Sequence, residues 1–256
     1  MHYIKLEEAG KRYLAKRFNL TIQENEFWVI SGANGSGKTT LLLMILGFIR
    51  PDVGLIDKKK LKIGYLPEKM MLPPFIKAFD YLETMARIKK DQVNMDYIYR
   101  LEVPLNASIY ELSKGNQQKL GILQAFMGHP KLIVLDEPFS GLDEKSAEIV
   151  VDILEEIMQE GVSFLISTHQ PERFRHLWTE HIELWFTWWI FYAIPKKNWV
   201  YSSYYFWVTP HGSLMSPINY GSNPMSSMSC FIFMTNLRTR WSFQWHRFLW
   251  GGYGWI

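Results

Sequence analysis

The segment 32–39, Gly-Ala-Asn-Gly-Ser-Gly-Lys-Thr, has the composition of a loop that wraps phosphate groups. Its glycines let the backbone curl so that successive N–H groups point at an anion, and Lys38 supplies a cation for the β- and γ-phosphates of a nucleotide. The hydroxyl of Thr39 suits Mg²⁺ beside such phosphates. Apolar flanks typical of a strand and a helix disfavour a chance glycine-rich turn. We expect the phosphates to contact Gly32, Asn34, Gly35, Ser36, Gly37, Lys38, Thr39 and Thr40.

Two adjacent acids, Asp136 and Glu137, follow the apolar run 132–135. That run is typical of a central strand, and the carboxyl ends of such strands form the ligand-binding edge of a parallel sheet. Asp136 then suits a place beside Mg²⁺, next to the groups that ligate the ion directly, and Glu137 suits polarising an attacking water. Taken alone, the pair would be interpreted as solvated loop carboxylates, but the phosphate loop earlier in the chain favours catalysis.

His169 follows the apolar run 162–168. A lone histidine is more often structural than catalytic. In a parallel sheet, however, the end of this strand would lie beside Glu137 and the γ-phosphate. We therefore take Glu137 and His169 as the candidate catalytic residues.

These groups need a scaffold, and the hydrophobic pattern predicts one of alternating strands and helices. Expected strands fall at 4–13, 17–22, 27–30, 62–67, 132–135 and 162–168. An apolar helix over 41–49 is expected to close at Arg50-Pro51, an amphipathic helix over 146–161 stops at Gly161, and 75–127 is mainly helical. This alternation favours a mainly parallel α/β sheet covered on both faces.

The composition allows a packed core and excludes several other classes of protein. The chain has 256 residues, is 48% hydrophobic and 21% charged, and carries a single cysteine, Cys230, so no internal disulfide can form. We expect no signal peptide, because 1–13 alternates apolar and charged residues. We also expect no spanning helix, because the longest apolar candidate, 184–194, is too short.

The net charge of +3 conceals two different compositions. Residues 184–256 hold five basic residues and no Asp or Glu, so this segment carries +5 and residues 1–183 carry 3 − 5 = −2. The mildly acidic first part argues against nucleic acid as its main partner. The second part also holds nine of the eleven Trp residues and shows no clear period.

Five motifs in a fixed order carry a resemblance to a known family. They are the phosphate loop 32–39, then Leu-Ser-Lys-Gly-Asn at 112–116, Leu-Ile-Val-Leu-Asp-Glu-Pro at 132–138, Ser-Gly-Leu-Asp at 140–143 and Ser-Thr-His at 167–169. Over residues 1–184 the chain resembles the ATP-binding subunit of an ABC transporter. The resemblance implies a P-loop NTPase fold with a mainly parallel central sheet, N-terminal antiparallel strands and a helical subdomain at about 70–127, with ATP and Mg²⁺ as cofactors.

The same resemblance assigns roles to three single residues. Tyr13 matches the aromatic side chain that stacks on adenine, although a tyrosine in the core would also fit the pattern. Glu68 stands where the family has a glutamine that touches Mg²⁺ and couples to the membrane subunits; a carboxylate can ligate Mg²⁺ but cannot donate a hydrogen bond. Asp143 matches the aspartate of the family's loop after the acid pair.

Residues 112–116 match the family signature Leu-Ser-Gly-Gly-Gln, with Lys114 and Asn116 as departures. In the family two such domains pair head to tail, and this segment contacts the γ-phosphate on the partner. The resemblance therefore assigns Ser113, Gly115 and Asn116 to ATP bound by a second chain, identical or related. Ser113 also suits the N-cap of a helix, and the two roles are compatible.

The implied function is an ATPase that powers transport. ATP would favour the closed dimer and hydrolysis would let it part, with the movement passed to separate membrane-spanning chains at the cytoplasmic face of the cell membrane. Non-transport members of the superfamily are the alternative. The DNA-repair members insert a long coiled coil between loop and signature, where this chain has only 113 − 38 = 75 positions, and the translation type carries two ATPase units.

The resemblance stops near Trp185, after an expected helix at 171–178 and an expected strand at 179–185. We interpret 185–256 as an irregular tail that does not derive from a folded-domain sequence, through a reading-frame change near codon 185. A membrane-surface segment is the alternative, since aromatic and basic residues favour the interface. An inactive product is a third outcome, if the tail impairs folding.

Overall fold

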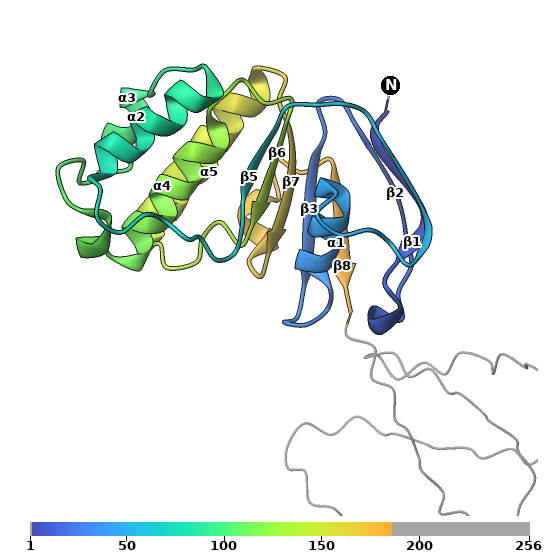
Figure 1. The fold of residues 1–256 in the computed structure, drawn as a ribbon. Helices are drawn as coiled ribbons and strands as arrows, with labels where there is room; N and C mark the ends of the chain where they lie inside the picture. Colours follow the sequence, from blue (N-terminus) through green and yellow to red (C-terminus); the bar gives the residue numbers. More distant parts are fainter. Residues whose placement is uncertain (1, 186–256) are drawn as a thin grey trace, which may run out of the picture. The chain divides into compact units, whose positions relative to one another are not determined.

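The structure is a computed structural model that describes residues 2–185, shown in Figure 1. Its strands are β1 (His2–Gly10), β2 (Phe18–Gln23), β3 (Phe27–Gly32), β4 (Val53–Lys58), β5 (Ile63–Leu66), β6 (Leu132–Asp136), β7 (Ser163–Thr168) and β8 (Glu180–Leu184). Its α-helices are α1 (Lys38–Leu46), α2 (Ala78–Lys89), α3 (Met95–Arg100), α4 (Lys114–Phe126) and α5 (Glu144–Gln159). The interpretations of the tail beyond Trp185 lie outside the described residues.

The strands form two sheets of different kinds. A five-stranded parallel sheet has the order β5-β6-β7-β3-β8, and a three-stranded antiparallel sheet has the order β2-β1-β4. Figure 1 shows α4 and α5 on one face of the parallel sheet, and α1 with the antiparallel strands on the other. The expected parallel sheet covered on both faces, with antiparallel strands at the N-terminus, is confirmed.

The central strands β3, β6 and β7 are buried on both faces, and most of their positions are apolar. In β3, Phe27 and Val29 belong to one hydrophobic core, while Trp28 and Ile30 belong to the other. Alternation with a period of two therefore produces no polar face in this strand. The sequence shows this as a short continuous apolar run.

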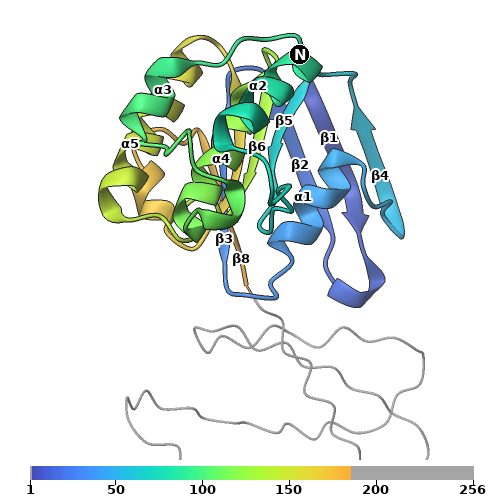
Figure 2. The same cartoon turned by 60° about the vertical axis from the view of Figure 1, so that its left-hand side comes forward.

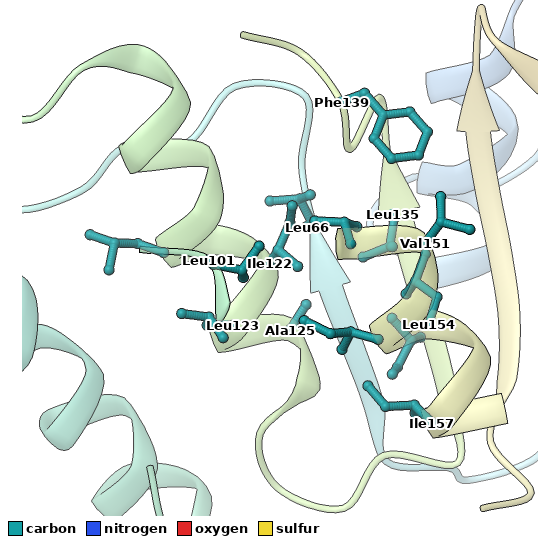
Figure 3. Packing of buried hydrophobic residues seen from close by; sticks show 14 of the residues in the cluster. Leu66, Leu101, Ile122, Leu123, Ala125, Leu135, Phe139, Val151, Leu154 and Ile157 are labelled. Carbon is teal, nitrogen blue, oxygen red and sulfur yellow. The ribbon is translucent and has the colours of Figure 1, made fainter. Parts of the chain in front are cut away.

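The first core lies between the parallel sheet and the helices α2, α4 and α5. Figure 3 shows side chains from β5, β6, α4 and α5 meeting in it, among them Leu66, Ile122, Leu135 and Leu154. The second core joins the opposite face of the sheet to α1 and the antiparallel strands, which lie side by side near α1 in Figure 2. Two cores hold the sheet rigid from both sides, which fixes the strand ends where the candidate groups lie.

Two helical segments differ from the sequence expectations. Helix α1 ends at Leu46 rather than Arg50, because Gly47 adopts the left-handed conformation (φ 86°) and its N–H caps the last turn. The expected helix at 171–178 is wrong; only a 3₁₀ turn forms at Pro171–Phe174. Phe174 is buried against Phe27, which holds the chain close to the sheet before β8 begins.

One strand and the helical region complete the described part. Strand β4 was not expected; it pairs with β1 through a pattern whose side chains are mostly exposed, so it lacks a clear apolar signal. The stretch 70–127 contains α2, α3 and α4, whereas the proposed domain boundary near 184 stays a prediction. None of the helices in the described range has the length and apolar character that a bilayer crossing requires.

Candidate functional site

The phosphate loop connects β3 to α1, and its glycines adopt conformations that other residues rarely take. Gly35 has a φ of 77° and Gly37 a φ of 103°, both in the left-handed region. A Cβ at Gly32 would lie 2.2 Å from the Leu184 carbonyl oxygen, so the end of β8 runs directly against the start of the loop. The expected strand–loop–helix arrangement is therefore present.

Lys38 lies at the first position of α1, and its side chain is buried at the centre of the loop. Its Nζ donates to the Gly32 carbonyl oxygen at 2.8 Å, lies 3.4 Å from Glu137 Oε1 and 3.3 Å from His169 Nε2. The three groups that the sequence placed at the ends of β3, β6 and β7 thus meet at one point. A parallel sheet produces this meeting because all of these strand ends lie on one edge.

Glu137 follows β6 directly and is held in place by contacts with the end of β7. The chain leaves β6 in a left-handed conformation at Glu137 (φ 51°), which is uncommon for a residue with a side chain. Its N–H donates to the Ser167 carbonyl oxygen at 3.0 Å, and its Oε1 lies 3.1 Å from His169 Nε2. The carboxylate is only 19% exposed, so the solvated-carboxylate interpretation is wrong for Glu137.

Asp136 is fully buried at the end of β6. Burial raises the pKa of its carboxyl group, while hydrogen bonds from Ser167 and Thr39 act in the opposite direction. Its second oxygen, Oδ2, is a buried acceptor with no hydrogen-bond partner within the described residues. A buried, unpaired carboxylate oxygen beside the Thr39 hydroxyl is a suitable donor set for Mg²⁺, so these residues fit that ion.

Glu68 lies near this pair but outside its hydrogen bonds. It is exposed and lines the cavity over the phosphate loop, and its charge acts to raise the pKa of Asp136. Between residues 2 and 185, no three His, Cys, Asp or Glu side chains gather in a way that would hold a metal by themselves. An ion here would therefore need hydroxyl and phosphate oxygens as well, as Mg²⁺ sites at nucleotides do.

A cavity of about 910 Å³ opens over these groups. Its lining comprises Tyr13, Leu14, residues 34–40, Glu68, Glu137, residues 139–142 and residues 168–170. Tyr13 is 67% exposed, and its hydroxyl lies 3.4 Å from Thr40 Oγ1 at the edge of the loop. The alternative of a core tyrosine is therefore wrong, and the ring is free to stack on a bound base.

The signature segment lies at the start of α4 and does not line this cavity. Ser113 is the N-cap, and its hydroxyl accepts from the Asn116 N–H at 3.2 Å. Gly115 packs so closely on the 140–143 loop that a Cβ would lie 2.5 Å from the Gly141 carbonyl oxygen. Close packing therefore requires a glycine at position 115, and the sequence did not predict this structural role of Gly115.

Asp143 serves in the structure as the N-cap of α5. Its Oδ1 accepts from the Ser146 N–H at 2.7 Å, and this bond is the main cause that lowers the pKa of its carboxyl group. A capping aspartate at a helix N-terminus is favoured by the helix dipole as well. Asp143 is another sequence-derived site residue that does not line the cavity.

Sequence reasoning missed three residues that position the site. Ser167 bonds both Asp136 and the Glu137 backbone, and it belongs to the motif that ends in His169. Gln118 is buried on α4 and donates to the Glu137 and Pro138 carbonyl oxygens. Lys16 donates to the Ser36 carbonyl oxygen. A polar residue on the buried face of a helix was the signal available for Gln118.

A phosphate loop, a buried acid pair and a histidine at the ends of adjacent parallel strands define a P-loop ATPase. Comparison with known proteins is consistent with that class. The model of the family "ABC transporter" matches residues 15–140.

Individual proteins match over a longer range. The uncharacterised ABC transporter ATP-binding protein MJ1023 of Methanocaldococcus jannaschii is 36% identical over 186 residues, covering 68% of this chain and 71% of that protein. The uncharacterised ABC transporter ATP-binding protein YhaQ of Bacillus subtilis is 38% identical over 175 residues, covering 62% of this chain and 59% of YhaQ. The dimeric structure of MJ0796, described as a bacterial ABC transporter cassette, superposes with a TM-score of 0.63 at 26% identity, covering 71% of this chain and 94% of that one.

The chain belongs to the ABC transporter family, as one of its ATP-binding subunits. Subunits of this kind are ATPases that power transport, so the family, the fold class and the ATPase function expected from the sequence are confirmed. The roles of the individual residues are a separate matter.

Proposed function

We propose that this chain binds ATP with Mg²⁺ in the cavity at the phosphate loop, and that Glu137 acts there as the general base of hydrolysis. The observation that carries the proposal is the meeting of Lys38, Glu137 and His169, with contacts of 3.1 to 3.4 Å, on the floor of one cavity. A cation for phosphate, a base for water and a histidine at the γ-phosphate position are the parts that phosphoryl transfer to water needs.

The ion pair between Lys38 and Glu137 suggests how nucleotide would prepare the base. The lysine ammonium lies 3.4 Å from the carboxylate, and both side chains are largely buried. The phosphates of ATP would compete for Lys38 and so release Glu137 to accept a hydrogen bond from water. His169 would keep the carboxylate oriented, since its N–H donates to Glu137 Oε2 at 3.3 Å and its ring contacts Oε1.

Thr39, Asp136 and Glu68 would hold Mg²⁺. When bound, the ion would neutralise charge on the β- and γ-phosphates. Asp136 is prepared for this role by its unpaired buried oxygen, and the bond from Ser167 fixes the orientation of its carboxylate. Glu68 would add a second carboxylate from the exposed side of the cavity.

A second cassette, paired head to tail, would complete the site. Ser113 is exposed at the N-terminus of α4, and the signature does not line the cavity of its own chain. Backbone N–H groups at a helix N-terminus suit an anion, so Ser113, Gly115 and Asn116 would contact the γ-phosphate bound by the partner. The partner is an identical or a related ATPase subunit.

Membrane-spanning partner chains would receive the movement. Three exposed apolar side chains, Met71, Phe75 and Tyr110, support this part of the proposal, because Met71 is 99% and Phe75 91% exposed. The segments meet where the Tyr110 N–H donates to the Pro74 carbonyl oxygen at 2.9 Å. Exposed apolar patches of this kind mark interaction sites. The chain would then lie at the cytoplasmic face of the cell membrane as a peripheral subunit.

Replacing Glu137 by glutamine tests the proposed chemistry. The amide is nearly the same size but cannot take a proton from water, so hydrolysis should fall by roughly 100-fold or more while ATP still binds. With ATP and Mg²⁺ present, size-exclusion chromatography should then show an accumulated dimer. Glu144→Gln is the matched control, because that glutamate is exposed, pairs with Arg173 and does not line the cavity.

Two results would contradict the proposal. Turnover by Glu137→Gln at the wild-type rate would show that Glu137 is not the general base of hydrolysis. Loss of hydrolysis together with loss of ATP binding would mean that Glu137 supports the fold or the loop rather than the reaction.

A further inference from the structure

Lys16 lies in the connection before β2 and contacts the phosphate loop from outside the cavity. Its Nζ donates to the Ser36 carbonyl oxygen at 2.9 Å and also to the Trp185 carbonyl oxygen. Lys16 does not line the cavity over the loop, so its ammonium is not placed to touch a bound nucleotide itself. Its contacts act on the backbone of the loop.

The Lys16 ammonium is partly buried, and its hydrogen bonds in the described part of the chain go to carbonyl oxygens rather than to a carboxylate. Burial lowers the pKa of its ammonium, yet no carboxylate within residues 2–185 pairs with it. Its neighbours behave differently: Lys11 pairs with Asp52, and Arg17 lies 3.6 Å from Glu8. A half-buried ammonium that donates only to carbonyl oxygens keeps its positive charge directed at the loop.

The bond to Ser36 sets the direction of the next peptide group. In a trans peptide the C=O and the N–H point in opposite directions. A Ser36 carbonyl held by Lys16 therefore turns the Gly37 N–H away from Lys16, toward the cavity that Gly37 lines. Within the described part of the chain that N–H has no acceptor, as suits a donor reserved for an anion.

The second bond fixes Lys16 itself. The Trp185 carbonyl oxygen follows β8, whose last residue, Leu184, already lies against Gly32 at the start of the loop. Lys16 thus joins the middle of the loop to the backbone that runs beside its beginning. Two backbone anchors on one ammonium restrict the loop more than a single bond would.

We propose that Lys16 is a positioning residue for phosphate binding, which holds the Ser36–Gly37 peptide so that its N–H faces the nucleotide. The inference deepens the proposed function and rests on its assignment of this loop to the phosphates of ATP. No residue motif of the sequence assigns Lys16 any role. Its effect should fall on nucleotide affinity, because Lys16 bonds the backbone of the loop and does not line the cavity where Glu137 lies.

The test compares Lys16→Met with Lys16→Arg in the full chain. Methionine keeps the apolar stem and loses the donors, whereas arginine can still donate to both carbonyl oxygens. We expect Lys16→Met to weaken ADP and ATP binding about tenfold by calorimetry and to raise the KM for ATP by a similar factor, with kcat within about twofold. Lys16→Arg should restore most of the affinity, and Arg17→Met, the exposed neighbour, should bind nucleotide like wild type.

Lys16→Gln provides a second variant if Lys16→Met does not fold, since its amide retains donors on a shorter stem; it should show a smaller loss of affinity in the same direction. Unchanged ADP affinity in a folded Met or Gln variant would overturn the inference, and so would a loss of kcat with unchanged KM. Lys38→Ala separates this failure from that of the proposed function. If Lys38→Ala also binds ATP normally, the loop assignment is wrong; if only the Lys16 variants do, the positioning role is wrong.

Discussion

The phosphate loop and the signature segment are both assigned to ATP by the sequence, and they differ in how the structure positions them. Lys38, Glu137 and His169 lie in the segments that follow three parallel strands, β3, β6 and β7, and contact one another directly. Ser113 lies exposed at the start of α4 and contacts none of them; its hydroxyl caps its own helix. The first group lines one cavity, whereas the second is an exposed helix end that does not line it.

The difference follows from the elements that carry each group. Parallel strands deliver their carboxyl ends to one edge of a sheet, so chemistry placed there meets on a single chain. A helix N-terminus in the helical region is positioned instead by its packing, here by Gly115 on Gly141. One chain is therefore equipped to bind nucleotide, and we expect the signature to affect turnover without affecting that binding. The following predictions test this contrast.

Lys38→Ala should have the largest effect, because it removes the buried cation at the β- and γ-phosphates. ATP binding should fall below detection in calorimetry, and hydrolysis should stop. Lys145→Ala is a suitable control, since that lysine is exposed and pairs with Glu102 far from the loop. ATP affinity and turnover like those of wild type would show that this loop does not bind the phosphates of ATP.

Ser113→Glu should separate the two regions. A glutamate is tolerated at a helix N-terminus through the helix dipole, so α4 should persist, while its charge would repel a phosphate on a partner chain. Hydrolysis should fall by about tenfold or more, with ATP affinity of the isolated chain within about twofold of wild type. A parallel loss of affinity in calorimetry would show that the signature contributes to binding on its own chain.

Asp143 should give the smallest effect, on stability alone. The Ser146 N–H lowers the pKa of the Asp143 carboxyl group in the folded chain. The ionised carboxylate therefore stabilises the fold at pH values above the pKa in the unfolded chain. This stabilisation is lost as the pH falls through the lower pKa of the folded chain. Asp143→Ala should lower Tm at neutral pH, with the difference from wild type shrinking in acid. Asp143→Asn should keep most of the cap without that pH dependence. A difference in Tm that is constant from neutral to acidic pH would contradict the capping role.

Much of the fold could be predicted because its signals are local. The central strands are apolar at most positions, and the loop, the acid pair and His169 lie at or just after the ends of such strands. Their meeting could therefore be expected from a parallel sheet. The position of Tyr13 at the cavity came from the resemblance to the family, since one aromatic residue carries no local signal. Its exposure then excludes core packing, and stacking on a base stays a prediction.

The rest depends on tertiary contacts that leave little trace in the sequence. Strand β4 has a weak pattern because its side chains are mostly exposed, and α1 ends early because Gly47 caps it. Lys16 is one of many basic residues near the N-terminus, and only its bonds to distant carbonyl oxygens distinguish it. Gly115 was assigned to phosphate, while its close approach to Gly141 could be found only from the packing.

The most direct test of the contrast between the two regions is a mixing experiment with Lys38→Ala and Ser113→Glu chains. The Lys38→Ala chain alone should be inactive, and the Ser113→Glu chain alone should keep about a tenth of the wild-type rate or less. In each pure dimer, both sites contain either an impaired phosphate loop or an impaired signature. In a one-to-one mixture, half of the dimers contain one chain of each kind and one intact site, so we predict recovery of about a quarter of the wild-type ATPase rate. A mixture that stays inactive, although affinity-tag pull-down shows that mixed dimers form, would contradict a signature that acts on the partner chain.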